Sequence, residues 1–214
     1  MNGISNKITF TSRNHVIRRA DDIARLVARE YPMLSATKYA GSPNCMQHAD
    51  SIRNLMKKIT TARNYICRIK ANYELLPEEK IRQYMDSVEK YGIGNCAEMT
   101  DTATIIAYMH NLKDTCKVML QTNVCRDLDH VALCVKDAKN PYIIDAWLGF
   151  ADYIPNALEK YKTIYKNYFM FSKVKEEKIE FREYPYNPIK KALDNVSNIE
   201  LYRLKKEFLW NKKY

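Results

Sequence analysis

Three residues of the chain have the types and the order of a thiol-dependent catalytic triad: Cys96, His130 and Asp145. A thiol attacks a carbonyl as its thiolate, and an imidazole is the side chain best suited to take up the thiol proton near neutral pH. A carboxylate can in turn hold that imidazole in the required tautomer and orientation. The three residues therefore predict nucleophilic attack on an amide carbonyl, with Cys96 as the nucleophile.

The residues before Cys96 predict that it opens a helix. Gly92 and Gly94, two of only five glycines in the chain, indicate a backbone that needs unusual torsions or a close approach. Asn95 and Glu98 have the spacing of a capping box, so we expect Asn95 to precede the helix and Cys96 to lie in its first turn. The unpaired N–H groups of a first turn favour negative charge, and hence a thiolate.

Short apolar segments with β-branched residues surround His130 and Asp145. They predict strands over residues 116–120, 130–135 and 142–147. The Lys-Asn-Pro sequence at residues 139–141 is typical of a turn and favours an antiparallel hairpin between the last two strands. Such a hairpin would place His130 and Asp145 on neighbouring strands.

Helical periodicity characterises the two flanks of this segment. We expect helices over residues 14–30, 47–73, 155–168 and 189–210, a further helix opened by Pro77, and one after Cys96. Helices combined with a small antiparallel sheet predict an α+β fold. The length is that of one domain over residues 1–214, with a helical N-terminal part (1–91), the catalytic core motifs (92–150) and C-terminal helices (151–214).

Residues 94–98, 129–133 and 142–147 resemble the three motif blocks of the transglutaminase-like superfamily. This superfamily includes transglutaminases, peptide N-glycanases and bacterial thiol proteases and deamidases. The Gly-x-Cys-x-Glu and Asp-His-Val motifs are especially similar to the N-glycanase branch. The resemblance covers about residues 92–150, with 34 residues from Cys96 to His130 and 15 from His130 to Asp145. It implies a papain-like or transglutaminase-like core, in which the catalytic cysteine starts a central helix packed on a small antiparallel sheet.

The chain also departs from these relatives. It has no Cys-x-x-Cys pair of the kind that holds zinc in N-glycanases, and it is much shorter than calcium-regulated transglutaminases. A small catalytic core with basic helical flanks looks more like a bacterial effector or toxin domain. That likeness implies a protein substrate, such as a host protein.

Several positions near the triad leave alternatives open. The backbone N–H of Cys96 is expected to supply one oxyanion donor, and Gln83, Gln121 and the Asn95 side chain are candidates for a second. Trp147, two residues after Asp145, is either a wall of the cleft or a core residue.

The other cysteines are expected to be core residues with free thiols, because the chain has no secretion signal and is large for a disulfide scaffold. These are Cys45, Cys67, Cys116, Cys125 and Cys134. Cys45 and His48 form a rival thiol–imidazole pair, but no carboxylate on a strand accompanies them. We expect no metal and no cofactor, since neither zinc-ligand spacing nor a phosphate-binding glycine loop is present.

The net charge of +10 is uneven: +7 in residues 1–91, −1 in 92–172 and +4 in 173–214. Solvated helix faces explain such flanks most simply, so we expect no nucleic-acid partner, while contact with a membrane surface through the basic flanks stays open. The sequence shows neither a signal peptide nor a long apolar segment. We therefore expect a soluble protein that is cytoplasmic or is delivered as an effector into a host cell.

Two functional hypotheses follow. The first is a thiol-dependent acyl-transfer enzyme acting on an amide bond of a protein, as a transglutaminase, a glutamine deamidase or a cysteine protease. The second is a catalytically inactive binding module whose basic helical flanks bind an acidic protein, a lipid or a nucleic acid. Selective, His130-dependent reactivity of Cys96 would favour the first.

Overall fold

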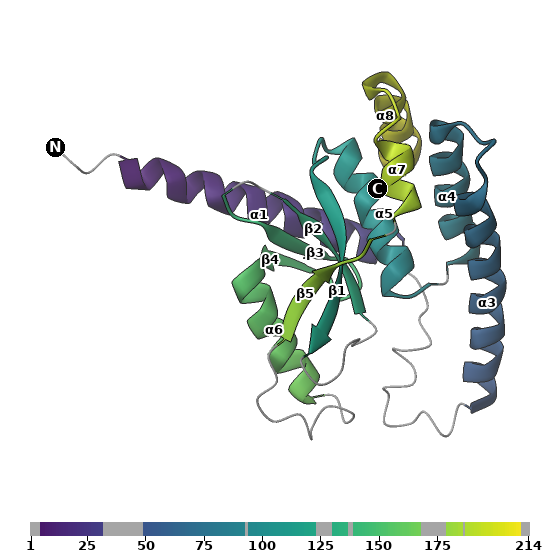
Figure 1. The fold of residues 1–214 in the computed structure, drawn as a ribbon, viewed down its shortest axis with the longest axis horizontal. Helices are drawn as coiled ribbons and strands as arrows, with labels where there is room; N and C mark the ends of the chain where they lie inside the picture. Colours follow the sequence, from purple (N-terminus) through teal and green to yellow (C-terminus); the bar gives the residue numbers. More distant parts are fainter. Residues whose placement is uncertain are drawn as a thin grey trace.

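The computed structural model describes residues 5–31, 49–92, 94–122, 130–136, 139–167, 179–185 and 187–210. Within these residues the protein has an α+β fold, in which helices surround a five-stranded antiparallel sheet (Figure 1). The helices are α1 (Ser5–Glu30), α3 (Ala49–Ala71), α4 (Pro77–Tyr91), α5 (Cys96–Met109), α6 (Ile154–Asn167), α7 (Pro188–Leu193) and α8 (Asn198–Lys205), with a π-helical turn η3 (Lys206–Trp210). The strands are β1 (Thr115–Thr122), β2 (His130–Val135), β3 (Tyr142–Asp145), β4 (Phe150–Tyr153) and β5 (Ile179–Glu183).

Strand β2 lies at the centre of the sheet, whose order is β4-β3-β2-β1-β5. Leu133 of β2 lies opposite Ile144 of β3, and both side chains belong to the larger hydrophobic cluster. Ala132 and Cys134 belong to the smaller cluster, on the other face of the sheet. Both faces of β2 are therefore covered, which explains why its sequence is almost continuously apolar.

Helices α1 and α5 pack on one face of the sheet and α6 packs on the other (Figure 1). Helices α4, α7 and α8 pack against α5, and α3 packs against α4. Because α5 is surrounded in this way, Ala97 is the only residue of this helix that is not buried. The helix that begins at Cys96 is thus the centre of the core.

The predicted helix opened by Pro77 is present as α4. Pro77 occupies its first turn together with Glu78 and Glu79, which complement the positive end of the helix. Gly92 ends the helix in a left-handed conformation, with φ 55°, and its N–H donates to the carbonyl of Val88 at 3.0 Å. This left-handed glycine turns the chain toward Cys96.

The prediction of a single closing helix over residues 189–210 is wrong. The structure has α7, a turn at residues 194–197, α8 and the π-helical turn η3. Ser197 starts α8, because its side chain accepts a hydrogen bond from the N–H of Glu200 at 3.2 Å. The apolar positions of the predicted helix are nevertheless buried: Leu193, Val196, Leu204 and Phe208.

The strand predicted over residues 142–147 ends earlier, at Asp145, where a turn begins. Gly149 in this turn has φ 73°, a conformation that favours glycine, and the chain then reverses into β4. Neither β4 nor the edge strand β5 was expected from the sequence. Both strands are short, and β5 is largely exposed, so their patterns are weak.

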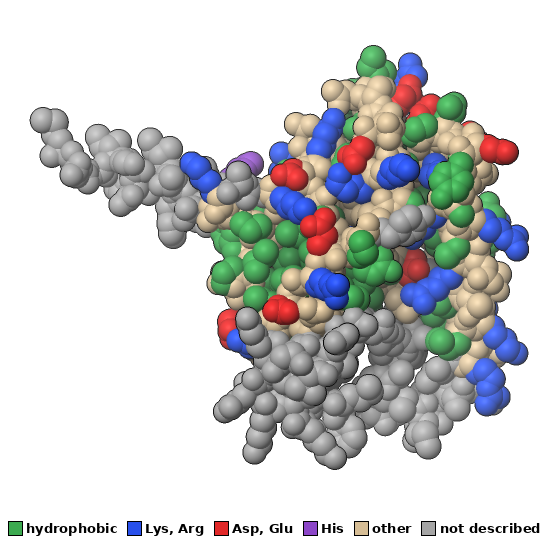
Figure 2. Space-filling model, in the orientation of Figure 1, with side chains coloured by type: hydrophobic (Ala, Val, Ile, Leu, Met, Phe, Trp, Pro, Cys, Tyr) green, Lys and Arg blue, Asp and Glu red, His purple; other side chains and the backbone are tan. Residues whose placement is uncertain are grey.

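Among the described residues, no helix has the length and apolarity needed to span a membrane. On the face shown in Figure 2, lysine and arginine side chains lie over several elements, with acidic side chains among them.

Candidate active site

Cys96 is the first residue of α5, as predicted. Asn95 precedes it with extended backbone torsions, and the N–H of Asn95 donates to Oε2 of Glu98 at 2.8 Å, which completes the capping box. Arg63 of α3 donates to both carboxylate oxygens of Glu98, at 3.0 and 3.3 Å. The cap that sets the position of Cys96 is thus itself anchored to a neighbouring helix.

His130 and Asp145 lie on the neighbouring antiparallel strands β2 and β3 and are joined by a hydrogen bond. Nε2 of His130 lies 2.6 Å from Oδ2 of Asp145. Both side chains are almost completely buried, at 3% and 1% exposure, so water does not compete for this contact. His130 opens β2 and Asp145 ends β3, which places the pair at one end of the sheet.

Asp145 accepts two further hydrogen bonds. The hydroxyl of Tyr161, on α6, donates to Oδ2, and the N–H of Leu148 donates to Oδ1 at 2.9 Å. Burial alone would raise the pKa of Asp145, but the charge of His130 and these hydrogen bonds hold it below its ordinary value. Asp145 is therefore ionised in the folded protein at neutral pH.

Cys96 completes the chain of contacts. Burial works against protonation of His130, but the charge and hydrogen bond of Asp145, together with a hydrogen bond to the Cys96 thiol, raise the pKa of the imidazole to about 10. Since Nε2 faces Asp145, Nδ1 is the ring nitrogen left for the sulfur. The structure thus brings the three predicted residues together in the order thiol, imidazole, carboxylate.

Thr100 connects the start of α5 to β2. Its Oγ1 lies 2.7 Å from the carbonyl oxygen of Cys96 and 3.0 Å from that of Val131. The hydroxyl proton is shared between the carbonyl oxygens of Cys96 and Val131. This contact fixes the distance between the two elements that bear Cys96 and His130.

Two aromatic rings cover the imidazole of His130. The ring of Trp147 lies 5.3 Å from it and that of Tyr161 lies 5.5 Å away, measured between ring centroids. Trp147 is partly buried and packs on the larger hydrophobic cluster as well. Trp147 is therefore a core residue that also lies against the imidazole.

All three candidate oxyanion donors form hydrogen bonds with other residues. Gln83 donates its amide to Glu79 within α4, and Gln121 donates to Glu180 of β5 at 2.8 Å. Asn95 caps α5 and lies next to Cys96. Asn95 alone of the three adjoins Cys96 in the chain, and its side chain accepts a hydrogen bond in the capping box of α5. The rival pair, Cys45 and His48, lies outside the described residues.

A buried ionic group holds α5 from the side. Asp101 of α5 is fully buried and forms ion pairs with Lys117 of β1, at 2.5 Å, and with Lys70 of α3. Burial alone would raise the pKa of Asp101, but the two lysines lower it below its ordinary value. The group ties the helix of Cys96 to a strand on one side and a helix on the other.

We expect Asp101→Asn to lower the free energy of unfolding by about 3–5 kcal/mol, because it leaves two lysines without their buried counter-charge. Urea denaturation measures this loss. Asp114→Asn is the matched control, since Asp114 is exposed and its replacement is expected to cost less than about 0.5 kcal/mol. Equal stability of the two variants would contradict the role given to the buried group.

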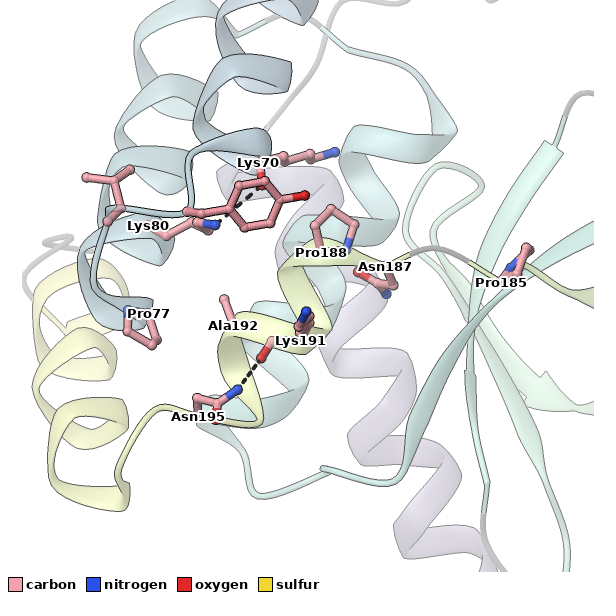
Figure 3. Close-up of a pocket in the computed structure, with 11 residues that line it drawn as sticks. Lys70, Pro77, Lys80, Pro185, Asn187, Pro188, Lys191, Ala192 and Asn195 are labelled. Carbon is pink, nitrogen blue, oxygen red and sulfur yellow. Dashed lines mark hydrogen bonds between the residues drawn. The ribbon is translucent and has the colours of Figure 1, made fainter.

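A cavity of about 400 Å³ lies away from the triad, between α7 and the turn that joins α3 to α4 (Figure 3). Tyr73, Pro77, Lys80 and Pro188 line it, and Nζ of Lys80 lies 5.7 Å from the centre of the Tyr73 ring. Its described lining contains lysines and amides but no thiol, imidazole or carboxylate. The cavity therefore contains none of the three residues of the predicted triad.

Comparison of the chain with protein-family models, with curated proteins and with solved structures finds no match.

Proposed function

We propose that this chain is a cysteine-dependent acyl-transfer enzyme that acts on an amide bond of a protein substrate. The observation that carries the proposal is the continuous hydrogen-bonded chain from Cys96 through His130 to Asp145. We further propose that residues 92–150 form a transglutaminase-like or papain-like core, since the cysteine begins a central helix and the other two residues lie on antiparallel strands. Action on a host protein as a bacterial effector stays a prediction from the resemblance.

The proposed reaction begins with an imidazolium at His130 beside the sulfur of Cys96. A raised imidazole pKa favours this charged form, and an imidazolium in contact with a sulfur favours the thiolate. The thiolate attacks the amide carbonyl carbon, a C–S bond forms, and backbone N–H groups at the start of α5 stabilise the oxyanion. His130 then gives its proton to the leaving nitrogen, and the C–N bond breaks to leave a thioester.

The second half of the reaction returns Cys96 to its starting state. Neutral His130 takes a proton from water or from an amine as that nucleophile attacks the thioester, and the C–S bond breaks. Water gives a carboxylic acid, by proteolysis or deamidation, and an amine gives a new amide. These outcomes share the same residues, so the acceptor and the shape of the substrate determine which one occurs.

Alkylation by iodoacetamide near neutral pH tests the nucleophile. Cys96 is buried and Cys67 is exposed, so accessibility alone predicts faster labelling of Cys67. The proposal predicts the reverse order, with Cys96 alkylated first and its advantage lost in His130→Gln, because only an activated thiolate overcomes the difference in exposure. Faster labelling of Cys67 in the wild-type chain would support the inactive binding module instead. Peptide mass spectrometry over a time course gives the rate at each cysteine.

Tyr161 is proposed as a positioning residue, because its hydroxyl shares Oδ2 of Asp145 with His130. Tyr161→Phe removes one donor from the carboxylate, so the pKa of Asp145 rises. We expect kcat/KM to fall about five- to tenfold, the effect of losing roughly 1 kcal/mol, and the acidic limb of the pH–rate profile to move to higher pH.

Tyr31→Phe is the matched control for this prediction. Tyr31 is also buried, and its hydroxyl donates to the carbonyl of Phe208 at 3.0 Å, away from the triad. Each of the two substitutions is expected to lower the free energy of unfolding by about 1 kcal/mol, the effect of one lost hydrogen bond, but Tyr31→Phe is expected to leave the pH–rate profile in place. If both variants have the wild-type profile, Tyr161 is a structural residue only.

A further inference from the structure

A second pair of thiols lies on the sheet, outside the proposed active site. Cys116 of β1 and Cys134 of β2 are directly opposite each other in the antiparallel register. Both side chains are on the face covered by α6, where they belong to the same hydrophobic cluster as Val118 and Ile143. Both are free thiols and both are largely buried, at 7% and 5% exposure.

The separation of two opposed strand residues is compatible with a disulfide. Directly opposite residues of an antiparallel pair have Cα atoms about 4.5–5.5 Å apart. Disulfides join residues whose Cα atoms are about 4.4–6.8 Å apart, so the register that pairs Cys116 with Cys134 is compatible with a disulfide between them. Cys67 and Cys96, the other two described cysteines, lie on different helices, α3 and α5.

The surroundings make the two thiols unequal. A hydrogen bond from Cys134 lowers the pKa of the Cys116 thiol. Burial and the charge of Glu183 raise that pKa, and the ammonium group of Lys136 lowers it. The same hydrogen bond raises the pKa of Cys134, so this thiol keeps its proton. Lys136 and Glu183 are exposed and form an ion pair at 2.9 Å, which shows that the charged groups acting on Cys116 are in contact with solvent. Cys116 is thus the better nucleophile, with a second thiol beside it.

We propose that Cys116 and Cys134 form a redox-active dithiol, which is converted to a cross-strand disulfide by exchange with a low-molecular-weight disulfide such as glutathione disulfide. The Cys116 thiolate attacks one sulfur of glutathione disulfide, an S–S bond forms, and the first glutathione leaves as a thiolate. The sulfur of Cys134 then attacks Sγ of Cys116, and the second glutathione leaves. Two protein thiols are oxidised by two electrons, one glutathione disulfide is reduced to two glutathiones, and the two thiol protons pass to the released thiolates.

This site is separate from the proposed triad. Cys96 contacts an imidazole, whereas Cys116 contacts a second thiol. Residue 134 lies near the end of β2 and His130 lies at its start. The dithiol is therefore expected to be oxidised in Cys96→Ala as it is in the wild-type chain, and its chemistry does not depend on the proposed enzyme activity.

The test incubates the reduced full-length chain with glutathione disulfide and digests it with trypsin without reductant. Mass spectrometry is expected to find residues 114–117 linked to residues 127–136, at a mass lower by two hydrogen atoms than the sum of the two peptides, and dithiothreitol is expected to remove the link. Exposed Cys67 is the internal reference and is expected to carry glutathione as a mixed disulfide. Glutathione on Cys67, with Cys116 and Cys134 both still thiols, would overturn the proposal.

Two variants test the order of the steps. Cys134→Ser removes the resolving thiol, so glutathione is expected to accumulate on Cys116. Cys116→Ser removes the attacking thiolate, so Cys134 is expected to stay unmodified. The opposite pattern, with glutathione accumulating on Cys134, would overturn the assigned roles. Peptide mapping of the wild-type chain requires neither variant to fold.

Discussion

The Cys96→Ala variant is expected to modify none of the proteins that the wild-type chain modifies. In the proposed reaction the thioester forms on the sulfur of Cys96, and Cys96 is the thiol that the structure gives as a partner of His130, so the variant lacks the proposed nucleophile. Removing the nucleophile of a comparable triad lowers kcat on the order of 10⁶-fold, which is complete loss in most assays. The measurement is mass spectrometry of candidate protein substrates incubated with each chain. It distinguishes backbone cleavage, conversion of an amide to an acid, and incorporation of an added amine.

Cys67→Ala is the matched control for this experiment. It removes an exposed thiol from α3 and is expected to keep wild-type activity. Circular dichroism and thermal unfolding of both variants exclude loss of the fold as the cause of any difference. Modification of a substrate by Cys96→Ala at the wild-type rate would remove Cys96 from the mechanism, whatever its contacts in the structure.

The elements that carry the triad are those that local sequence predicts best. The capping residues Asn95 and Glu98 are three positions apart, so the start of α5 at Cys96 is specified within one helical turn. Strand β2 spans residues 130–135 as predicted, and the hairpin to β3 follows from its apolar segments and the turn between them. The proximity of His130 and Asp145 needs only this one hairpin.

The residues that support the triad depend on contacts that local sequence does not encode. Tyr161 is one of sixteen tyrosines, and only the packing of α6 against the sheet brings its hydroxyl to Asp145. Asp101 lies in a helix whose neighbours on both sides are distant in the sequence, so its pairing with Lys70 and Lys117 has no local pattern. In the sequence, Thr100 looks like any threonine within a helix. Only the packing of β2 against α5 brings the carbonyl of Val131 to its hydroxyl.

Local signals also explain the wrong prediction of one closing helix. Residues 189–210 have helical periodicity, but Asp194, Asn195 and Ser197 are residues whose side chains compete with a helical backbone. Apolar periodicity alone therefore overstates the length of the helix. The error concerns the C-terminal helices α7 and α8, which pack against α5. None of the three triad residues lies in these helices.

Asp145 is the residue on which the protonation state of the proposed site depends most. Asp145→Asn keeps the size of the side chain but removes the largest influence that raises the pKa of the His130 imidazole, so we expect that pKa to fall from about 10 toward the value favoured by burial. The neutral imidazole becomes more populated and can adopt the wrong tautomer, and kcat/KM is expected to fall about 10⁴-fold. Asp152→Asn is the matched control on the neighbouring strand β4, where the carboxylate pairs with Lys160.

Stability against pH gives a second measurement of the same change. An imidazole whose pKa is raised on folding contributes stability that is complete below the unfolded value of 6.5 and is lost as pH rises toward about 10. The comparison uses Cys96→Ala with and without Asp145→Asn, so that ionisation of the thiol does not contribute. The chain that keeps Asp145 is expected to lose stability from pH 6.5 upward, and the chain that carries the substitution is expected to lack this loss.

Asp152→Asn, added to Cys96→Ala, is the control for the pH series. Folding lowers the pKa of the Asp152 carboxyl, so its contribution to stability is complete above the unfolded value and is lost only as pH falls. Its replacement is therefore expected to leave the loss of stability above pH 6.5 in place. A parallel pH dependence in the chains with and without Asp145→Asn would show that Asp145 does not control the charge of His130, and the proposed imidazolium would then lack its physical cause.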